Sequence, residues 1–170
     1  MSSLLIIAAI GMFSFIFIAT ANVPIRSQDA LLYIDSTKKY SGLKEEDKNT
    51  YAVWFSNYWD DELMIPSQIG DKPVAFVIKS TENKWYFRYS RMETVYIPST
   101  MKYIGDNAFD CCDKLETVYY AGSEEAWKKV TVCKGNDAIT QADIYFYSET
   151  RPQTDGLYWH YVDGNITQWK

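Results

Sequence analysis

Residues 92–122, METVYIPSTMKYIGDNAFDCCDKLETVYYAG, hold the internal repeat from which the fold can be predicted. Met92 and Leu115 are 23 residues apart, and each begins the same pattern: an apolar residue, two polar residues, then Val-Tyr and another apolar residue. Residues 94–97 are expected to form a short strand whose Val95 points toward a core. A period of 23 is typical of leucine-rich repeats, and one such unit must stack on another to bury its apolar face.

The spacing of residues within this repeat resembles a known family. The matching residues are Ile97-Pro98-Ser99, Ile104-Gly105, Ala108-Phe109, Cys112 and Leu115. They look like the IP…IG..AF..C..L signature of the BspA-like leucine-rich repeat family. Its members are found on bacterial surfaces and in some protists, and are implicated in adhesion and protein recognition rather than chemistry. The resemblance implies an α/β-type repeat that is mostly β: a short leucine-rich repeat solenoid with parallel strands, an N-terminal β cap and a C-terminal β-hairpin.

The repeat region is expected to span residues 62–122. A degenerate repeat opens it, because Ile65-Pro66-Ser67 matches Ile97-Pro98-Ser99 at an interval of 32 residues. Each strand would be followed by a return segment, such as residues 101–112, whose apolar side chains back the strand.

Residues 123–170 are expected to form the closing module. Ser123 is a candidate helix N-cap followed by acidic residues, which favour a helix start. The segment resembles the closing module of the family, and residues 144–147 would supply its last strand. Asp163-Gly164 lies between alternating aromatic residues, a pattern typical of a β-hairpin. One face of that hairpin, with Trp159 and Tyr161, is expected to seal the C-terminal end of the stack.

Residues 1–21 are predicted to form a signal peptide. They carry no charged side chain and end in Ala19-Thr20-Ala21, an A-x-A cleavage pattern. No Lys or Arg precedes the apolar run, which leaves an uncleaved anchor as the alternative, since about 17–25 residues can span a bilayer. Residues 22–61 are expected to form the N-terminal cap, with strands at 30–35 and 51–55 separated by a loop that carries charges of both signs.

Composition limits the partners. The chain has 170 residues, enough for one substantial core, and a net charge of −5. A negative net charge disfavours binding to nucleic acid or anionic lipid, both of which are negative. Contact with a membrane is therefore expected only through an uncleaved N-terminal segment, if at all. Three cysteines in this arrangement have no zinc spacing. Cys112 is expected to be a small core residue, while a bridge between Cys111 and Cys133 stays open.

The sequence predicts no enzyme, no cofactor and no catalytic residue. It has no Gly-rich phosphate loop, no HExxH and no GxSxG motif. The single histidine, His160, lies in an aromatic strand without a nucleophile motif nearby, which favours a structural or surface role over catalysis. The acidic clusters at 60–62 and 110–113 could offer carboxylates, but neither has calcium-loop spacing, so no metal site is predicted.

The candidate ligand-binding residues follow from strand alternation. If four apolar residues (Leu63, Val95, Val118 and Ile144) point into the core, their neighbours point outward. The outward neighbours include two acidic residues, Glu62 and Asp143, and six residues assigned to the candidate ligand-binding face: Met64, Thr94, Tyr96, Thr117, Tyr119 and Tyr145. Three tyrosines would form one column across adjacent strands, suited to contact with protein or glycan. The alternative is that this column only stabilises the sheet by cross-strand pairing.

The sequence is compatible with two functions. The first is a secreted or cell-surface recognition or adhesion module, extracellular and non-catalytic, for protein or glycan ligands. The alternative is a structural terminal fragment or accessory cap of a larger repeat protein, without a ligand of its own.

Overall fold

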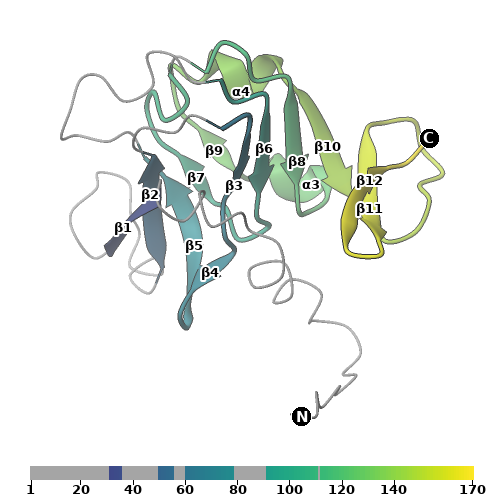
Figure 1. Cartoon of the computed structure of the whole chain (residues 1–170), viewed down its shortest axis with the longest axis horizontal. Helices are drawn as coiled ribbons and strands as arrows, with labels where there is room; N and C mark the ends of the chain where they lie inside the picture. Colours follow the sequence, from purple (N-terminus) through teal and green to yellow (C-terminus); the bar gives the residue numbers. More distant parts are fainter. Residues whose placement is uncertain (1–30, 36–49, 56–59, 79–90, 111) are drawn as a thin grey trace.

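A computed structural model describes residues 31–35, 50–55, 60–78, 91–110 and 112–170 (Figure 1). The predicted signal peptide or anchor at residues 1–21, and the charged loop between the first two predicted strands, lie outside the described residues. The described part is mostly β, with parallel strands and few helices. None of its helices has the length and apolar character needed to cross a bilayer.

The described strands form two sheets. The first sheet has the order β1-β2-β5-β7-β9, with β4 also paired to β5. Its strands are β1 (Leu31–Asp35), β2 (Tyr51–Phe55), β4 (Gln68–Ile69), β5 (Lys72–Val77), β7 (Tyr103–Ile104) and β9 (Thr131–Val132). The second sheet has the order β12-β11-β10-β8-β6-β3. Its strands are β3 (Glu62–Met64), β6 (Thr94–Ile97), β8 (Thr117–Tyr120), β10 (Asp143–Tyr147), β11 (Tyr158–Val162) and β12 (Asn165–Gln168). From β2 to β10 the chain alternates between the two sheets (Figure 1).

The register of the second sheet follows the sequence intervals. β6 and β8 pair in parallel with Val95 opposite Val118, so residues 23 apart lie side by side. The neighbouring pairs place Leu63 opposite Val95 and Ile144 opposite Val118. Because side chains alternate along a strand, all four point to one face. Leu63, Val95 and Val118 are fully buried and Ile144 is half-buried against them, which confirms the inward direction predicted for this row.

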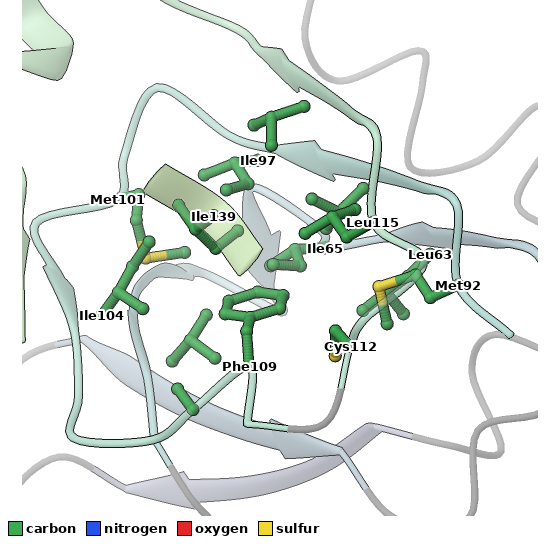
Figure 2. Close-up of a cluster of buried hydrophobic side chains, with 14 of the residues drawn as sticks. Leu63, Ile65, Met92, Ile97, Met101, Ile104, Phe109, Cys112, Leu115 and Ile139 are labelled. Carbon is green, nitrogen blue, oxygen red and sulfur yellow. The ribbon is translucent and has the colours of Figure 1, made fainter. Parts of the chain in front are cut away.

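The core lies between the two sheets. It combines inward residues of the second sheet with Val77 and Ile104 of the first sheet in one buried cluster. Figure 2 shows Phe109 at the middle of this cluster, with the Cys112 side chain close by. Phe109 is 1% exposed, and burying such a ring contributes about 1.5–3 kcal/mol. The predicted core role of Cys112 is confirmed, since its side chain is fully buried in the cluster.

The return segment contributes a strand of its own. Residues Tyr103–Ile104 form β7, which pairs in parallel with β5 through Phe76 and Val77. The Gly105 N–H also donates to the Val77 carbonyl over 2.7 Å. The return segment therefore joins the first sheet through β7, and from there its side chains pack against the second sheet.

The two strands predicted near the N-terminus are confirmed as β1 and β2, to within one residue. They pair antiparallel, with Tyr33 opposite Val53. β2 then pairs in parallel with β5, with an irregularity between Tyr51 and Ala52. These strands continue the first sheet.

The predicted helix start at Ser123 is confirmed. The Ser123 side chain accepts a hydrogen bond from the Ala126 N–H over 3.3 Å at the start of α3 (Glu124–Trp127). Trp127 is half-buried against the core, with its ring edge-on to Tyr120 at a centroid distance of 5.0 Å. A second short helix, α4 (Asp137–Gln141), precedes β10 and buries Ile139.

The predicted C-terminal hairpin is also confirmed. β11 and β12 are antiparallel, with Val162 opposite Asn165 across a two-residue turn. Asp163 and Gly164 have φ angles of 50° and 80°, the left-handed values that a type I′ turn requires at both positions. β11 also pairs in parallel with β10, so the hairpin extends the second sheet.

Candidate functional site

The face of the second sheet that points away from the core carries two rows of side chains, and we call it the outer face. Alternation places residues i and i+2 of each strand on the same face. The strand register brings Glu62, Thr94, Thr117 and Asp143 into one row, and Met64, Tyr96, Tyr119 and Tyr145 into the next. All six predicted surface residues therefore lie together on this face, each half-buried. Glu62 and Asp143 are exposed at the two ends of the first row.

Three rings of the second row, Tyr96, Tyr119 and Tyr145, form the tyrosine column. The first two rings are stacked, with centroids 5.2 Å apart and planes 10° apart. Tyr119 and Tyr145 lie 5.4 Å apart and are tilted by 38°. These spacings are close to the separation of about 4.8 Å between neighbouring strands, because the rings rise from equivalent positions of adjacent parallel strands. The column therefore covers the faces of its inner ring and presents ring edges outward.

Carboxylates mark both ends of the tyrosine column. The Tyr96 hydroxyl donates to a carboxylate oxygen of Glu62 over 3.4 Å. Burial, and then the negative charge of Glu62, raise the pKa of Tyr96 well above its usual range. At the other end, burial and then Asp143 raise the pKa of Tyr145. The Tyr96 and Tyr145 hydroxyls, at the two ends of the column, therefore stay protonated to a higher pH than an ordinary tyrosine.

The C-terminal hairpin packs against part of this column. The Gln168 side-chain amide donates to the Tyr119 hydroxyl over 2.9 Å, and the Trp159 ring meets Tyr119 edge-on at 5.9 Å. Trp159 is 1% exposed, and its indole N–H donates to the Tyr120 carbonyl over 2.9 Å. The expectation that the Trp159 face seals the end of the stack thus needs revision. Because β11 continues the sheet from β10, alternation puts Trp159 beside Tyr147 on the outer face.

One residue that contacts the column, Gln168, was missed in the sequence. Gln168 lies 49 residues from Tyr119, and no local pattern connects them. Alternation had already pointed Glu62 and Asp143 outward, although they were not assigned as binding residues, and the register places both on the outer face.

The other candidates of the sequence lie apart from this face or have structural contacts. The His160 ring stacks on Trp169, with centroids 3.7 Å apart and planes 11° apart. Cys133 is a free cysteine. A hydrogen bond with Cys133, followed by burial, raises the pKa of Tyr103 to about 12. Cys111 lies outside the described residues.

Metal-binding side chains are not grouped in the described part of the chain. No cluster of three or more His, Cys, Asp or Glu side chains is arranged there to hold an ion. The outer face holds all six binding residues predicted from the sequence.

Comparisons of the chain with models of protein families, with curated proteins and with solved structures found no match. The geometry of the outer face therefore provides the support for a function.

Proposed function

We propose that this chain is a secreted or cell-surface recognition module that binds a protein or glycan through the outer face, without catalysis. The observation that carries the proposal is the tyrosine column: three partly exposed rings in register on adjacent parallel strands, with centroids 5.2 and 5.4 Å apart. Tyrosine gives a large contact area at low conformational cost and keeps a polar edge, which explains its enrichment in binding surfaces.

We further propose that the fold is a short leucine-rich repeat solenoid of the BspA-like type. The parallel pairing of residues 23 apart in β6 and β8, and the alternation of the chain between two sheets, support this assignment. Residues 62–122 would form the repeats, residues 123–170 the closing module, and residues 22–61 the N-terminal cap. The β1–β2 pair at one edge of the first sheet supports the cap.

Export is part of the same proposal. The Ala19-Thr20-Ala21 pattern supports cleavage after residue 21, and an uncleaved anchor is the alternative. N-terminal sequencing of protein recovered from the medium of a secretory host should find Asn22 first. Intact Met1 in a membrane fraction would favour the anchor.

A second candidate function is structural: a terminal cap of a larger repeat protein. The contacts of Gln168 and Trp159 with Tyr119 favour it, because they use part of the column inside the molecule. In this reading the tyrosines stabilise the sheet through cross-strand pairs, each worth about 0.2–1 kcal/mol.

The two functions can be separated by a variant that keeps the contacts of Tyr119 with Gln168 and Trp159 of the hairpin. Tyr96→Ser and Tyr145→Ser together remove the outer rings of the column and keep Tyr119. Tyr158→Ser is the matched control, because alternation puts Tyr158 on the opposite face from Trp159. The wild type and both variants would be screened on protein and glycan arrays, and their unfolding measured in urea.

If the chain is a recognition module, the Tyr96/Tyr145 variant should lose binding to an array ligand that the Tyr158 variant still binds. Stability lost in the Tyr96/Tyr145 variant, with no array ligand for the wild type, would instead support the structural cap.

A further inference from the structure

The C-terminal hairpin carries a modification motif that the tyrosine column does not use. Asn165-Ile166-Thr167 fits the pattern Asn-x-Ser/Thr, with x other than proline, that the eukaryotic secretory pathway recognises for N-linked glycosylation. No other asparagine among the 170 residues is followed two positions later by serine or threonine. The position of the motif in the fold determines whether it can carry a glycan.

The motif lies where a folded chain can hold a bulky polar group. Asn165 is exposed and begins β12, directly after the Asp163-Gly164 turn. The hairpin itself continues the second sheet beyond β10 (Figure 1). A glycan needs such a surface position, because its volume and its hydroxyls must remain in water. Asn136 shows the contrast, since it is 2% exposed and no glycan fits there without opening the protein.

The contacts of the Asn165 side chain are compatible with an N-linked sugar. Its amide nitrogen donates to the Asp163 carbonyl over 3.4 Å, which is long beside the usual N–H to O distance of about 2.9–3.0 Å. The amide nitrogen has two hydrogens, and glycosylation replaces one of them. The other hydrogen can therefore still make this bond in the glycosylated protein.

Both functional residues of the motif lie on one face of the hairpin. In the antiparallel pairing of β11 and β12, Asn165 is opposite Val162 and Thr167 is opposite His160. Directly opposed residues share a face, with Cβ atoms about 4.5–5.5 Å apart. Val162 is one of two large hydrophobic side chains exposed in the described part of the chain. The first sugar on Asn165 would therefore lie beside this exposed apolar side chain.

The opposite face of the hairpin is the one that meets the tyrosine column. Trp159 and Gln168 are paired there, and both contact Tyr119. Because successive side chains of a strand alternate between faces, a group attached to Asn165 projects away from these contacts. A glycan at this position thus leaves the outer face uncovered.

We propose that Asn165 is the acceptor of an N-linked glycan, which projects from the hairpin face opposite the tyrosine column. Transfer forms a bond between Nδ2 of Asn165 and the anomeric carbon of the first sugar. The bond from that carbon to the diphosphate of a lipid-linked oligosaccharide donor breaks, the lipid diphosphate leaves, and the amide gives up one proton. The inference rests on the export that forms part of the proposed function, since the donor and its transferase belong to the secretory pathway.

Expression of the full chain in cultured animal cells tests the acceptor. Protein from the medium and from the cells is weighed by mass spectrometry before and after peptide N-glycosidase, which removes the glycan and leaves aspartate in place of the acceptor asparagine. The wild type should lose the mass of a glycan, with the aspartate at position 165. Thr167→Ala and Asn165→Gln should abolish this mass difference, whereas Thr167→Ser keeps the hydroxyl and should retain it.

A second form separates the acceptor from export, because the full chain is expressed behind the leader of a protein that these cells secrete. Protein without a glycan in this form would overturn the acceptor site, and so would unglycosylated protein secreted by the chain's own N-terminus. The latter result would leave export intact. A glycan found only with the added leader would support the acceptor site and contradict export.

NMR spectra of protein with labelled valine and tyrosine test the direction of the glycan. Between the glycosylated wild type and unglycosylated Asn165→Gln, the methyl signals of Val162 should shift and the ring signals of Tyr119 should not. A shift of the Tyr119 signals with Val162 unchanged would place the glycan against the tyrosine column and refute its assignment to the opposite face.

Discussion

Replacing Asn136 by alanine should destabilise the protein more than any other single loss of an amide side chain among its described residues. Asn136 is 2% exposed and sits just before α4. Although it occupies the N-cap position, its side chain makes no cap hydrogen bond. It instead accepts from the Phe109 N–H over 2.9 Å, and donates to the carbonyls of Gly105 over 2.9 Å and Cys133 over 2.8 Å.

The size of the effect follows from these three bonds. Alanine would leave one N–H and two carbonyls without this partner in a buried place. Each hydrogen bond contributes about 0.5–1.5 kcal/mol net, so we expect a loss of about 3 kcal/mol in the free energy of unfolding. For a chain of this length the melting temperature should fall by about 6–12 °C. The close approach of Gly135 to the Asn107 side chain leaves the backbone little room to relax, since a Cβ at Gly135 would collide with that side chain.

Urea unfolding followed by tryptophan fluorescence measures this loss, with Asn165→Ala as the matched control. Asn165 is exposed and makes one long hydrogen bond of 3.4 Å, to the Asp163 carbonyl, so its replacement should change stability by no more than about 0.5 kcal/mol. Asn136→Asp keeps an acceptor for Phe109 but sets a carboxylate against two carbonyls, and should be at least as harmful as alanine. If Asn136→Ala were as stable as Asn165→Ala, the stabilising role of the hydrogen bonds from Asn136 to residues 105–109 and to Cys133 would be refuted.

Three further predictions concern the core, the hairpin turn and one tyrosine. Phe109→Ala should cost about 3–5 kcal/mol through lost burial and a cavity, and an unchanged urea midpoint would contradict its place in the core. Gly164→Ala should cost about 1 kcal/mol by backbone strain alone, because φ is +80° and nothing lies within 4 Å of the added Cβ; thermal unfolding would reveal it, and no shift would argue against the type I′ turn. Cys133→Ala should lower the pKa of Tyr103 from about 12 toward its usual value near 10, as followed by NMR titration of labelled tyrosine. Since that pKa is raised in the folded state, the stability it contributes is complete below pH 10 and lost as the pH rises toward 12; an unaltered titration in the variant would rule out the hydrogen bond as the cause.

The sequence alone was enough to predict the inward and outward side chains of β3, β6, β8 and β10 in the second sheet. Alternation is a local property with a period of two, so the Val-Tyr pairs at 95–96 and 118–119 determine which side chain points in and which points out. The 23-residue interval then sets which residues become neighbours, as the pairing of Tyr96 with Tyr119 shows. The Asp163-Gly164 turn was predictable for the same reason, since its left-handed backbone is a local demand.

Only the tertiary structure decided how much of the tyrosine column is available to a ligand. The hairpin reaches Tyr119 because β11 pairs with β10, which brings Trp159 of β11 and its partner Gln168 of β12 onto the outer face. Such pairing depends on contacts between residues far apart in the chain. The hydrogen bond from Asn136 to the Gly105 carbonyl is equally non-local, because the two residues lie 31 positions apart. Hydrogen bonds of this kind form only after packing has excluded water from the site, and no spacing in the sequence records them.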